Sequence, residues 1–219
     1  MASGYLSVGD LPKVVPVFPL EGVLLLPRAD LPLQIFEPRY LNMVDDAMAG
    51  ERLIGMVQKR PGGDRTHPRL AAVGCAGRIT SYAETSDGRY LITLTGVCRF
   101  AVGEELSIRT PYRQVRAHFE AYAGDLREDE AAETTDRGRF IAALKRYLRH
   151  RALDIDWETA ESAPLEALAN SLAMGLPFDP GERQAILEAA DFPARFQVLT
   201  ALLEIDALDD DDDAPPAVQ

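Results

Sequence analysis

The residue types that most often hold metals or act as nucleophiles are scarce in this chain, and their spacing suits neither role. His67, His118 and His150 lie far apart, and neither a His-x-x-x-His nor a Cys-x-x-Cys pattern occurs. A structural zinc site draws four ligands from short spacings of this kind. The sequence therefore predicts no metal site and no bound cofactor.

The two cysteines, Cys75 and Cys98, each stand inside an apolar run that is typical of a strand. A free cysteine in such a run is commonly a small buried hydrophobic residue. A nucleophilic thiol would need a base within reach, and His118 could approach either cysteine across a folded barrel. We expect buried thiols without a catalytic role.

Phosphate chemistry also lacks its usual motif. A P-loop needs Gly-Lys-Ser/Thr, so that backbone amides and a lysine surround the phosphates. The three lysines, Lys13, Lys59 and Lys145, do not follow glycines. No constellation for a hydrolase can be recognised either, so we predict that the chain is not an enzyme.

The sharpest polar candidates stand where a helix is predicted to begin. In one interpretation Glu37 caps that helix and Arg39 pairs with a carboxylate, which joins the helix to the strands. In the other, these residues line a groove for an extended peptide, and the candidate contacts are Phe36, Glu37, Arg39, Tyr40 and Arg78. The first interpretation is favoured, because a motif at a helix start usually serves the helix.

The elements that position these residues begin with residues 17–40, in which three apolar runs are separated by Pro-Leu-Glu-Gly and Pro-Arg-Ala-Asp. Turn-forming segments at such short intervals predict short strands and turns. Pro38 then suits the first turn of a helix. Apolar positions recur at helical spacing up to Met48, and Gly50 could end the helix in a left-handed conformation.

Strand signals continue as far as residue 120. Apolar or alternating patterns predict four strands, Leu53–Gln58, Leu70–Ala83, Tyr90–Val102 and Tyr112–Phe119. Ser86-Asp87-Gly88 predicts a hairpin between the second and third of these strands. Residues 60–68 are polar and rich in glycine and proline, which predicts a flexible loop. Together these segments predict a compact, mostly antiparallel barrel.

Helical patterns replace strand patterns after an acidic stretch at residues 124–136. One helix begins near Arg137. A second carries Leu165 to Leu176, with Ser162 as a plausible cap. A third opens at a capping box, Asp179-Pro180-Gly181-Glu182, and the last starts at Asp191-Phe192-Pro193.

The order of these phrases resembles a known family. Residues 16–44 read PVFPLEGVLLLPRADLPLQIFEPRYLNMV, and Ile54-Gly55-Met56-Val57, Val73 to Ile79 and Gly96 to Phe100 follow in order. This pattern is similar to the Lon substrate-binding domain, the N-terminal region of ATP-dependent Lon proteases, which also occurs as a free-standing bacterial protein. The resemblance covers about Pro12 to Ile205. It implies a PUA-like barrel joined to helices, and a recognition module without the ATPase domain or the Ser–Lys protease domain.

The predicted fold class is therefore α+β, with a PUA-like, mostly antiparallel β-barrel followed by an α-helical bundle. The expected layout is an extension at 1–12, a barrel at 13–123, an acidic linker at 124–136, a bundle at 137–206 and a disordered acidic tail at 207–219.

The charge and composition limit the classes of partner that the chain can have. The formal net charge is −12, with Asp+Glu 35 and Lys+Arg 23. This acidity disfavours a general phosphate-binding surface. The bases between Arg139 and Arg151 could still touch RNA, as some PUA-like barrels do, although the acidic linker could neutralise them.

The first ten residues lack the features of a signal peptide, no apolar run approaches a membrane span, and two cysteines fit a reducing compartment. We therefore expect a cytoplasmic protein without a membrane partner. The first hypothesis is a module that binds unfolded or extended polypeptide segments, in partnership with a protease or another quality-control machine. RNA binding is the alternative.

Overall fold

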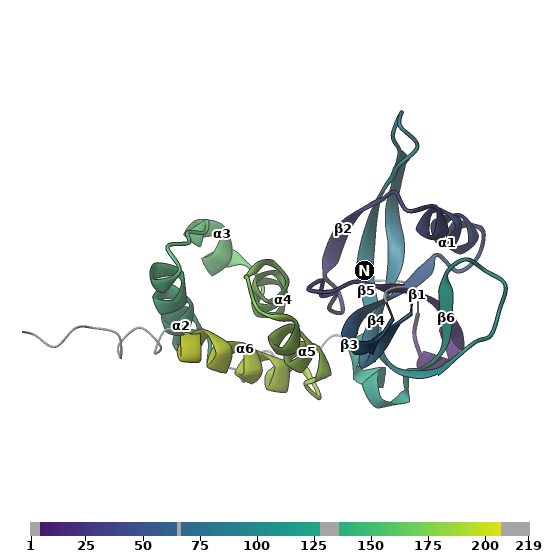
Figure 1. Ribbon diagram of the computed structural model, residues 1–219. Helices are drawn as coiled ribbons and strands as arrows, with labels where there is room; N and C mark the ends of the chain where they lie inside the picture. Colours follow the sequence, from purple (N-terminus) through teal and green to yellow (C-terminus); the bar gives the residue numbers. More distant parts are fainter. Residues whose placement is uncertain (1–4, 65–66, 128–135, 207–219) are drawn as a thin grey trace, which may run out of the picture.

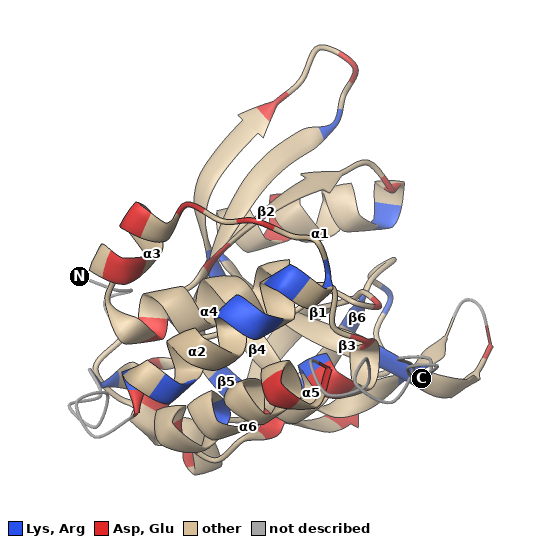
Figure 2. Cartoon of the chain, turned by 90° about the vertical axis from the view of Figure 1, so that its left-hand side faces the viewer, with Lys and Arg blue, Asp and Glu red and all other residues tan. Residues whose placement is uncertain are grey.

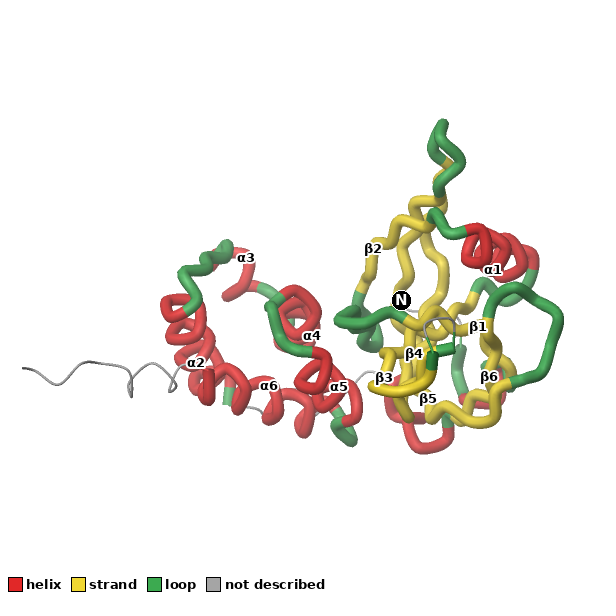
Figure 3. Tube along the Cα trace, in the orientation of Figure 1, coloured by secondary structure: helices red, strands yellow, loops and turns green. Residues whose placement is uncertain are grey.

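The computed structural model describes residues 5–64, 67–127 and 136–206. The expected acidic tail at 207–219 and most of the expected linker, residues 128–135, lie outside the described residues. Strands and helices gather on opposite sides of the molecule, with α1 (Pro38–Ala49) as the α-helix that accompanies the strands (Figures 1 and 3).

Six strands form one sheet in the order β2-β5-β4-β3-β1-β6. A further pairing between β5 and β6 closes five of them into a ring, which leaves β2 outside the closure, paired with β5. The β1–β3 pair is parallel and the other pairs are antiparallel. The strands are β1 (Val14–Pro19), β2 (Asp30–Ile35), β3 (Leu53–Gly63), β4 (Pro68–Glu84), β5 (Tyr90–Glu105) and β6 (Arg113–His118).

The four strands expected after residue 50 are all present, but the loop expected at residues 60–68 is not a simple loop. Strand β3 continues through Arg60 to Gly63, and β4 begins at Pro68. These paired ends of β3 (residues 58–63) and β4 (residues 68–72) form the β3–β4 arm. The glycines and prolines that suggested a loop are accommodated there by a register shift between Arg60 and Gly63. Irregular strands of this kind carry turn-forming residues without ending.

The α1 helix begins at Pro38 as expected, but its end differs from the expectation. Gly50 has a φ of −119°, so it is not left-handed. The positive φ of 58° falls two residues later, at Arg52. Its backbone N–H donates to the carbonyl of Ala47 at 2.9 Å, which completes the helix end.

The second half of the described chain is helical. The α5 capping box is confirmed, since the Asp179 carboxylate accepts from the Glu182 N–H at 2.8 Å and the Glu182 carboxylate accepts from the Asp179 N–H at 2.8 Å. Ser162 does not cap the second long helix. It ends a short helix that the sequence did not reveal, and Pro164 precedes α4. The helices are α2 (Arg137–His150), α3 (Trp157–Ser162), α4 (Leu165–Gly175), α5 (Pro180–Glu188) and α6 (Phe192–Asp206), and 3₁₀ segments cover Val8–Asp10 and Glu120–Leu126.

Among the described residues, buried apolar side chains form two clusters, and the larger one extends from the barrel into the helices. One cluster of buried residues includes Phe18, the run Leu24 to Leu26, and Leu203 of α6. Gly96 permits this close packing, because a Cβ there would stand 2.0 Å from the Leu26 carbonyl oxygen. The predicted α+β class, a barrel followed by a helical bundle, is confirmed. Among the described residues, no helix is both long and apolar enough to span a membrane.

Candidate functional site

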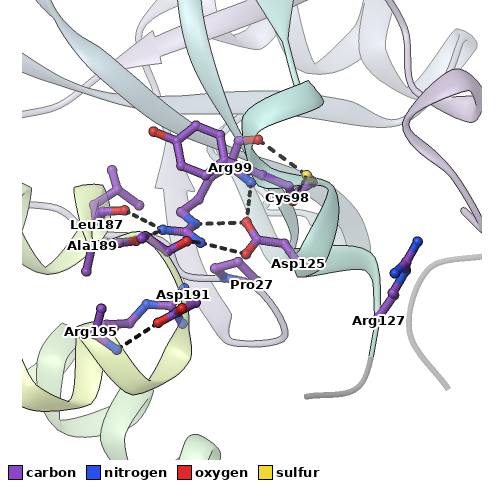
Figure 4. Close-up of polar contacts among 12 residues, drawn as sticks. Pro27, Cys98, Arg99, Asp125, Arg127, Leu187, Ala189, Asp191 and Arg195 are labelled. Carbon is purple, nitrogen blue, oxygen red and sulfur yellow. Dashed lines mark hydrogen bonds and ion pairs between the residues drawn. The ribbon is translucent and has the colours of Figure 1, made fainter. Parts of the chain in front are cut away.

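The junction between barrel and helices is built around a buried ion pair. Arg99 of β5 is 1% exposed, and its Nε and Nη2 donate to the two carboxylate oxygens of Asp125 at 2.8 Å each (Figure 4). The same guanidinium donates to the carbonyls of Leu187, Ala189 and Ala190 at the end of α5. The planar guanidinium of arginine presents five N–H donors in a fixed arrangement, so it can bind a carboxylate with two hydrogen bonds and still donate to carbonyls. Asp125, which the sequence placed in a linker, is buried in the 3₁₀ segment 120–126.

A second arginine fixes α4 beside the start of β2. Arg28 has a φ of 66°, and its guanidinium forms a bidentate pair with Glu166 of α4. Its Nη1 also donates to the Asp125 carbonyl at 2.6 Å. One helical turn further, the Asn170 amide donates to the Pro27 carbonyl at 3.0 Å. The turn before β2 is thus attached to α4 at two points.

Beyond these attachments a cleft of about 660 Å³ separates β2 from α4. Residues 28–32 line one wall, and α4 lines the other with residues that include Ala167, Ser171 and Met174. Its surfaces are mostly apolar, with Arg28 and Glu166 at the polar end. A cleft with apolar walls and few convergent polar groups is the usual form of a binding site.

One edge of β2 is unpaired among the described residues, and the parity of the ladder indicates which groups it offers. Gly96 N–H donates to the carbonyl of Ala29 at 2.8 Å, so Ala29 points toward β5. In an antiparallel ladder the backbone N–H and C=O groups of successive residues point alternately to the two sides of the strand. The backbone groups of Leu31 and Leu33 therefore point toward β5, and those of Asp30 and Pro32 point outward. A proline belongs on the outward side, where its missing N–H breaks no ladder bond.

The structure distributes the five candidate residues over three places, and none of them lines this cleft. Phe36 follows β2 directly and is 63% exposed. Arg39 and Tyr40 line a smaller cavity of about 260 Å³ on the α1 side. Arg78 lies on β4, with its guanidinium 5.9 Å from the Tyr5 ring. The cleft itself was missed, since its walls come from segments more than a hundred residues apart.

The favoured interpretation of Glu37 and Arg39 is correct only in part. Glu37 precedes α1, but its side chain caps no backbone N–H. Arg39 does pair with a carboxylate, which is that of Glu37 itself at 2.8 Å, and it stacks on Tyr40 at 4.5 Å. The pair is more than two-fifths exposed on both sides, so it contributes at most about 1 kcal/mol. It does not join the helix to the barrel.

The cysteines are buried, as expected. Burial raises the pKa of the Cys98 thiol to about 12, and the charge of Asp125 acts in the same direction. Burial likewise raises the pKa of Cys75. His118 is exposed on β6. A thiol with a raised pKa is a poor nucleophile, and the described residues hold no cluster of His, Cys, Asp and Glu that could bind a metal ion.

The basic stretch of α2 is largely paired. Arg139 forms two hydrogen bonds with Glu204 of α6, and Arg151 forms a bidentate pair with Asp206. Acidic and basic positions are interspersed over this helical face (Figure 2). These partners come from α6, whereas the sequence suggested the acidic linker.

Comparison with known proteins places this geometry in a family. The family model for the ATP-dependent protease La (LON) substrate-binding domain matches residues 14–204. A Lon protease 2 of Sorangium cellulosum is 30% identical over 200 residues, and that of Myxococcus xanthus is 25% identical over 210. These matches cover 86% and 91% of this chain, which spans about a quarter (24%) of either relative.

Solved structures agree on the fold. A Lon N-terminal domain protein from Xanthomonas campestris superposes with a TM-score of 0.61 at 25% identity, covering 87% of this chain and 98% of the other. The N-terminal domain of a Mycobacterium avium complex Lon protease gives 0.59 at 17% identity, with the same coverage, and shows the fold alone. With a family model that spans nearly all of the described barrel and helices, the chain belongs to the Lon substrate-binding domain family.

Proposed function

We propose that this chain is a non-catalytic module that binds extended segments of unfolded polypeptide in the cleft between β2 and α4. The observation that carries the proposal is the unpaired edge of β2 beside an apolar cleft of about 660 Å³. A strand edge offers main-chain hydrogen bonds to any sequence, and the cleft can hold apolar side chains. Such a site suits clients that share no motif.

Membership of the Lon substrate-binding family supports the same ligand class. The matched relatives are named Lon proteases, and this chain corresponds to about a quarter of their length. A protease or another quality-control machine is therefore the partner that we propose for client transfer. Phe36 is exposed just after β2, outside the residues that line the cleft, and its role in binding stays a prediction. Roles for Glu37, Arg39, Tyr40 and Arg78 in binding stay predictions.

RNA binding is the weaker alternative. A protein that binds nucleic acid through phosphates needs a basic surface. Here Arg139 and Arg151 are held by carboxylates of α6, and the chain carries a formal charge of −12. The neutralised bases favour polypeptide over RNA.

Filling the cleft should weaken binding without unfolding the protein. Ala167 is exposed on α4 and lines the cleft, so Ala167→Phe occupies the space that a client needs. We expect at least roughly tenfold weaker binding of a fluorescently labelled, reduced and carboxymethylated polypeptide, about 1.4 kcal/mol. Fluorescence anisotropy measures the affinity, and circular dichroism confirms an unchanged fold.

The matched control is Ala142→Phe, the same change on an exposed position of α2 away from the cleft. It should bind like the wild type. Equal affinities for Ala167→Phe and the wild type would show that clients bind elsewhere, and an oligouridylate bound in preference to the polypeptide would favour the RNA alternative.

A further inference from the structure

A second cleft lies on another part of the barrel–helix junction, between the β3–β4 arm and α5. Its volume is about 740 Å³. Gln58, from β3, lines it and is 3% exposed. The side-chain oxygen of Gln58 is buried and accepts no hydrogen bond from any described residue. A buried acceptor without a donor is unfavourable, so this oxygen marks a place where a ligand's donor would be stabilised.

The orientation of the Gln58 amide is fixed by its neighbours. Its Nε2 donates to the Pro180 carbonyl at 3.1 Å and to the Gln184 Oε1 at 3.1 Å. Rotating the amide by half a turn would bring its oxygen against the Pro180 carbonyl, and both bonds would be lost. The oxygen is therefore the group left over, and it needs an N–H or O–H donor.

The β3–β4 ladder is interrupted at this point. Val57 pairs with Gly74, and the next pair is Lys59 with Leu70, so Gln58 has no partner in register. Ala71 and Ala72 lie opposite it without register partners in β3 or β5.

Gln184 of α5 contacts the strand at this interruption, since its Nε2 donates to the Val73 carbonyl at 3.1 Å. The register of the β3–β4 ladder is thus irregular where the cleft opens.

The walls of this cleft fit a polypeptide main chain. Small residues line it, including Ala72, Gly181 and Ala185. The rim carries both signs of charge, with Lys59 and Arg60 against Glu21 and Glu188. A balanced rim and small walls select a neutral, slender ligand, and an amide N–H is the donor that every residue of such a ligand provides.

We infer that this cleft is a second polypeptide subsite, in which Gln58 accepts a hydrogen bond from a main-chain N–H of an extended segment with small side chains. The inference rests on the proposed function for its ligand class, but on different residues. A client long enough to reach both clefts would be held at two points, and its affinity would exceed that of either contact alone.

Nuclear magnetic resonance with the acetylated peptide amide Ala-Thr-Ala-Thr-Ala-Thr-Ala reads the two clefts separately. The peptide should shift the Gln58 side-chain amide and the backbone signal of Ala72. These shifts should persist in Ala167→Phe, where the first cleft is filled. They should disappear in Ala185→Phe, where an exposed wall residue of α5 fills the second cleft, and remain in the control Ala142→Phe.

The hydrogen bond is tested with peptides that each carry one N-methyl group, titrated into Ala167→Phe. At least one of them should bind threefold more weakly or worse, and the additional change Gln58→Met should remove this difference.

The resonance shifts separate the possible outcomes. If the peptide shifts the signals of Leu31 and Ser171 but not that of Gln58, the Gln58 acceptor serves water only and the inference fails while the proposed function stands. If it shifts neither cleft, both fail. Shifts at Gln58 without shifts at Leu31 would retain this subsite and remove the first.

Discussion

Arg99 is the residue on which the junction most depends. Removing one partner of a buried ion pair leaves the other charge without compensation and typically costs about 3–5 kcal/mol. We expect Arg99→Met to lower the free energy of unfolding by that amount in urea denaturation. Arg89→Met is the control, because Arg89 pairs with Asp87 on the surface at 48% and 57% exposure and should cost less than about 1 kcal/mol. Similar losses for the two variants would contradict this account of Arg99.

The Cys98 thiol makes stability depend on pH in the alkaline range. Its pKa is raised from 9.0 to about 12 in the fold, mainly by burial. A group that holds its proton more tightly when folded stabilises the fold fully below pH 9 and loses that contribution as the pH rises toward 12. The unfolding free energy of the wild type should therefore fall with pH more steeply than that of Cys98→Ala, by roughly 1 kcal/mol per pH unit. Denaturation at pH 8 to 11 measures both slopes, and equal slopes would refute the burial of this thiol.

At the scale of the element, the α5 cap is the clearest local determinant. Asp179 satisfies an N–H at the start of the helix that carries Gln184 and the Leu187 carbonyl bound by Arg99. Asp179→Ala should cost about 1 kcal/mol. Asp154→Ala, in the loop before α3, is the exposed control with no helix to cap. Thermal melts compare the two, and a loss no greater than that of the control would mean that the Asp179 cap does not stabilise the protein.

Elements with local signals could be predicted from the sequence, and those without could not. The capping box of α5 and the hairpin at Asp87 are encoded within four residues, so both were predictable. The α3 helix has six residues and one buried side chain, Ala160, which gives no helical periodicity to detect. The β3–β4 arm was misread because its turn-forming residues lie within irregular strands.

The site was less predictable than the fold, because its contacts join distant parts of the chain. Arg99 lies 26 residues from Asp125 and about 90 from the carbonyls of Ala189 and Ala190. The Arg28–Glu166 pair spans 138 residues. No spacing rule reaches that far. The signal available in the sequence was an arginine inside an apolar run, and Arg99 lies in such a run, Gly96 to Phe100.

For the whole molecule, we propose that the barrel at 13–123 and the helices at 137–206 unfold as one unit despite their different architectures. One core cluster runs through both, and the Arg99 pair is buried between them. Differential scanning calorimetry should show a single transition, with equal calorimetric and van't Hoff enthalpies. Two separate transitions would mean that the two parts are independently stable.

The position of β6 in the ring has a consequence for synthesis on the ribosome. Strands β1 and β5 are joined only when Arg113 to His118 has emerged, so the nascent barrel stays open until then. The hydrogen bonds from the Arg99 guanidinium to the carbonyls of Leu187 to Ala190 form later still, because those residues are synthesised after β6. At about 5–20 residues per second this interval is roughly 4–14 s. During that time the barrel of a newborn copy can close, but its Arg99 guanidinium lacks the carbonyls that receive it in the finished fold. The unfinished helical half is then itself the kind of extended chain that we propose the finished protein binds.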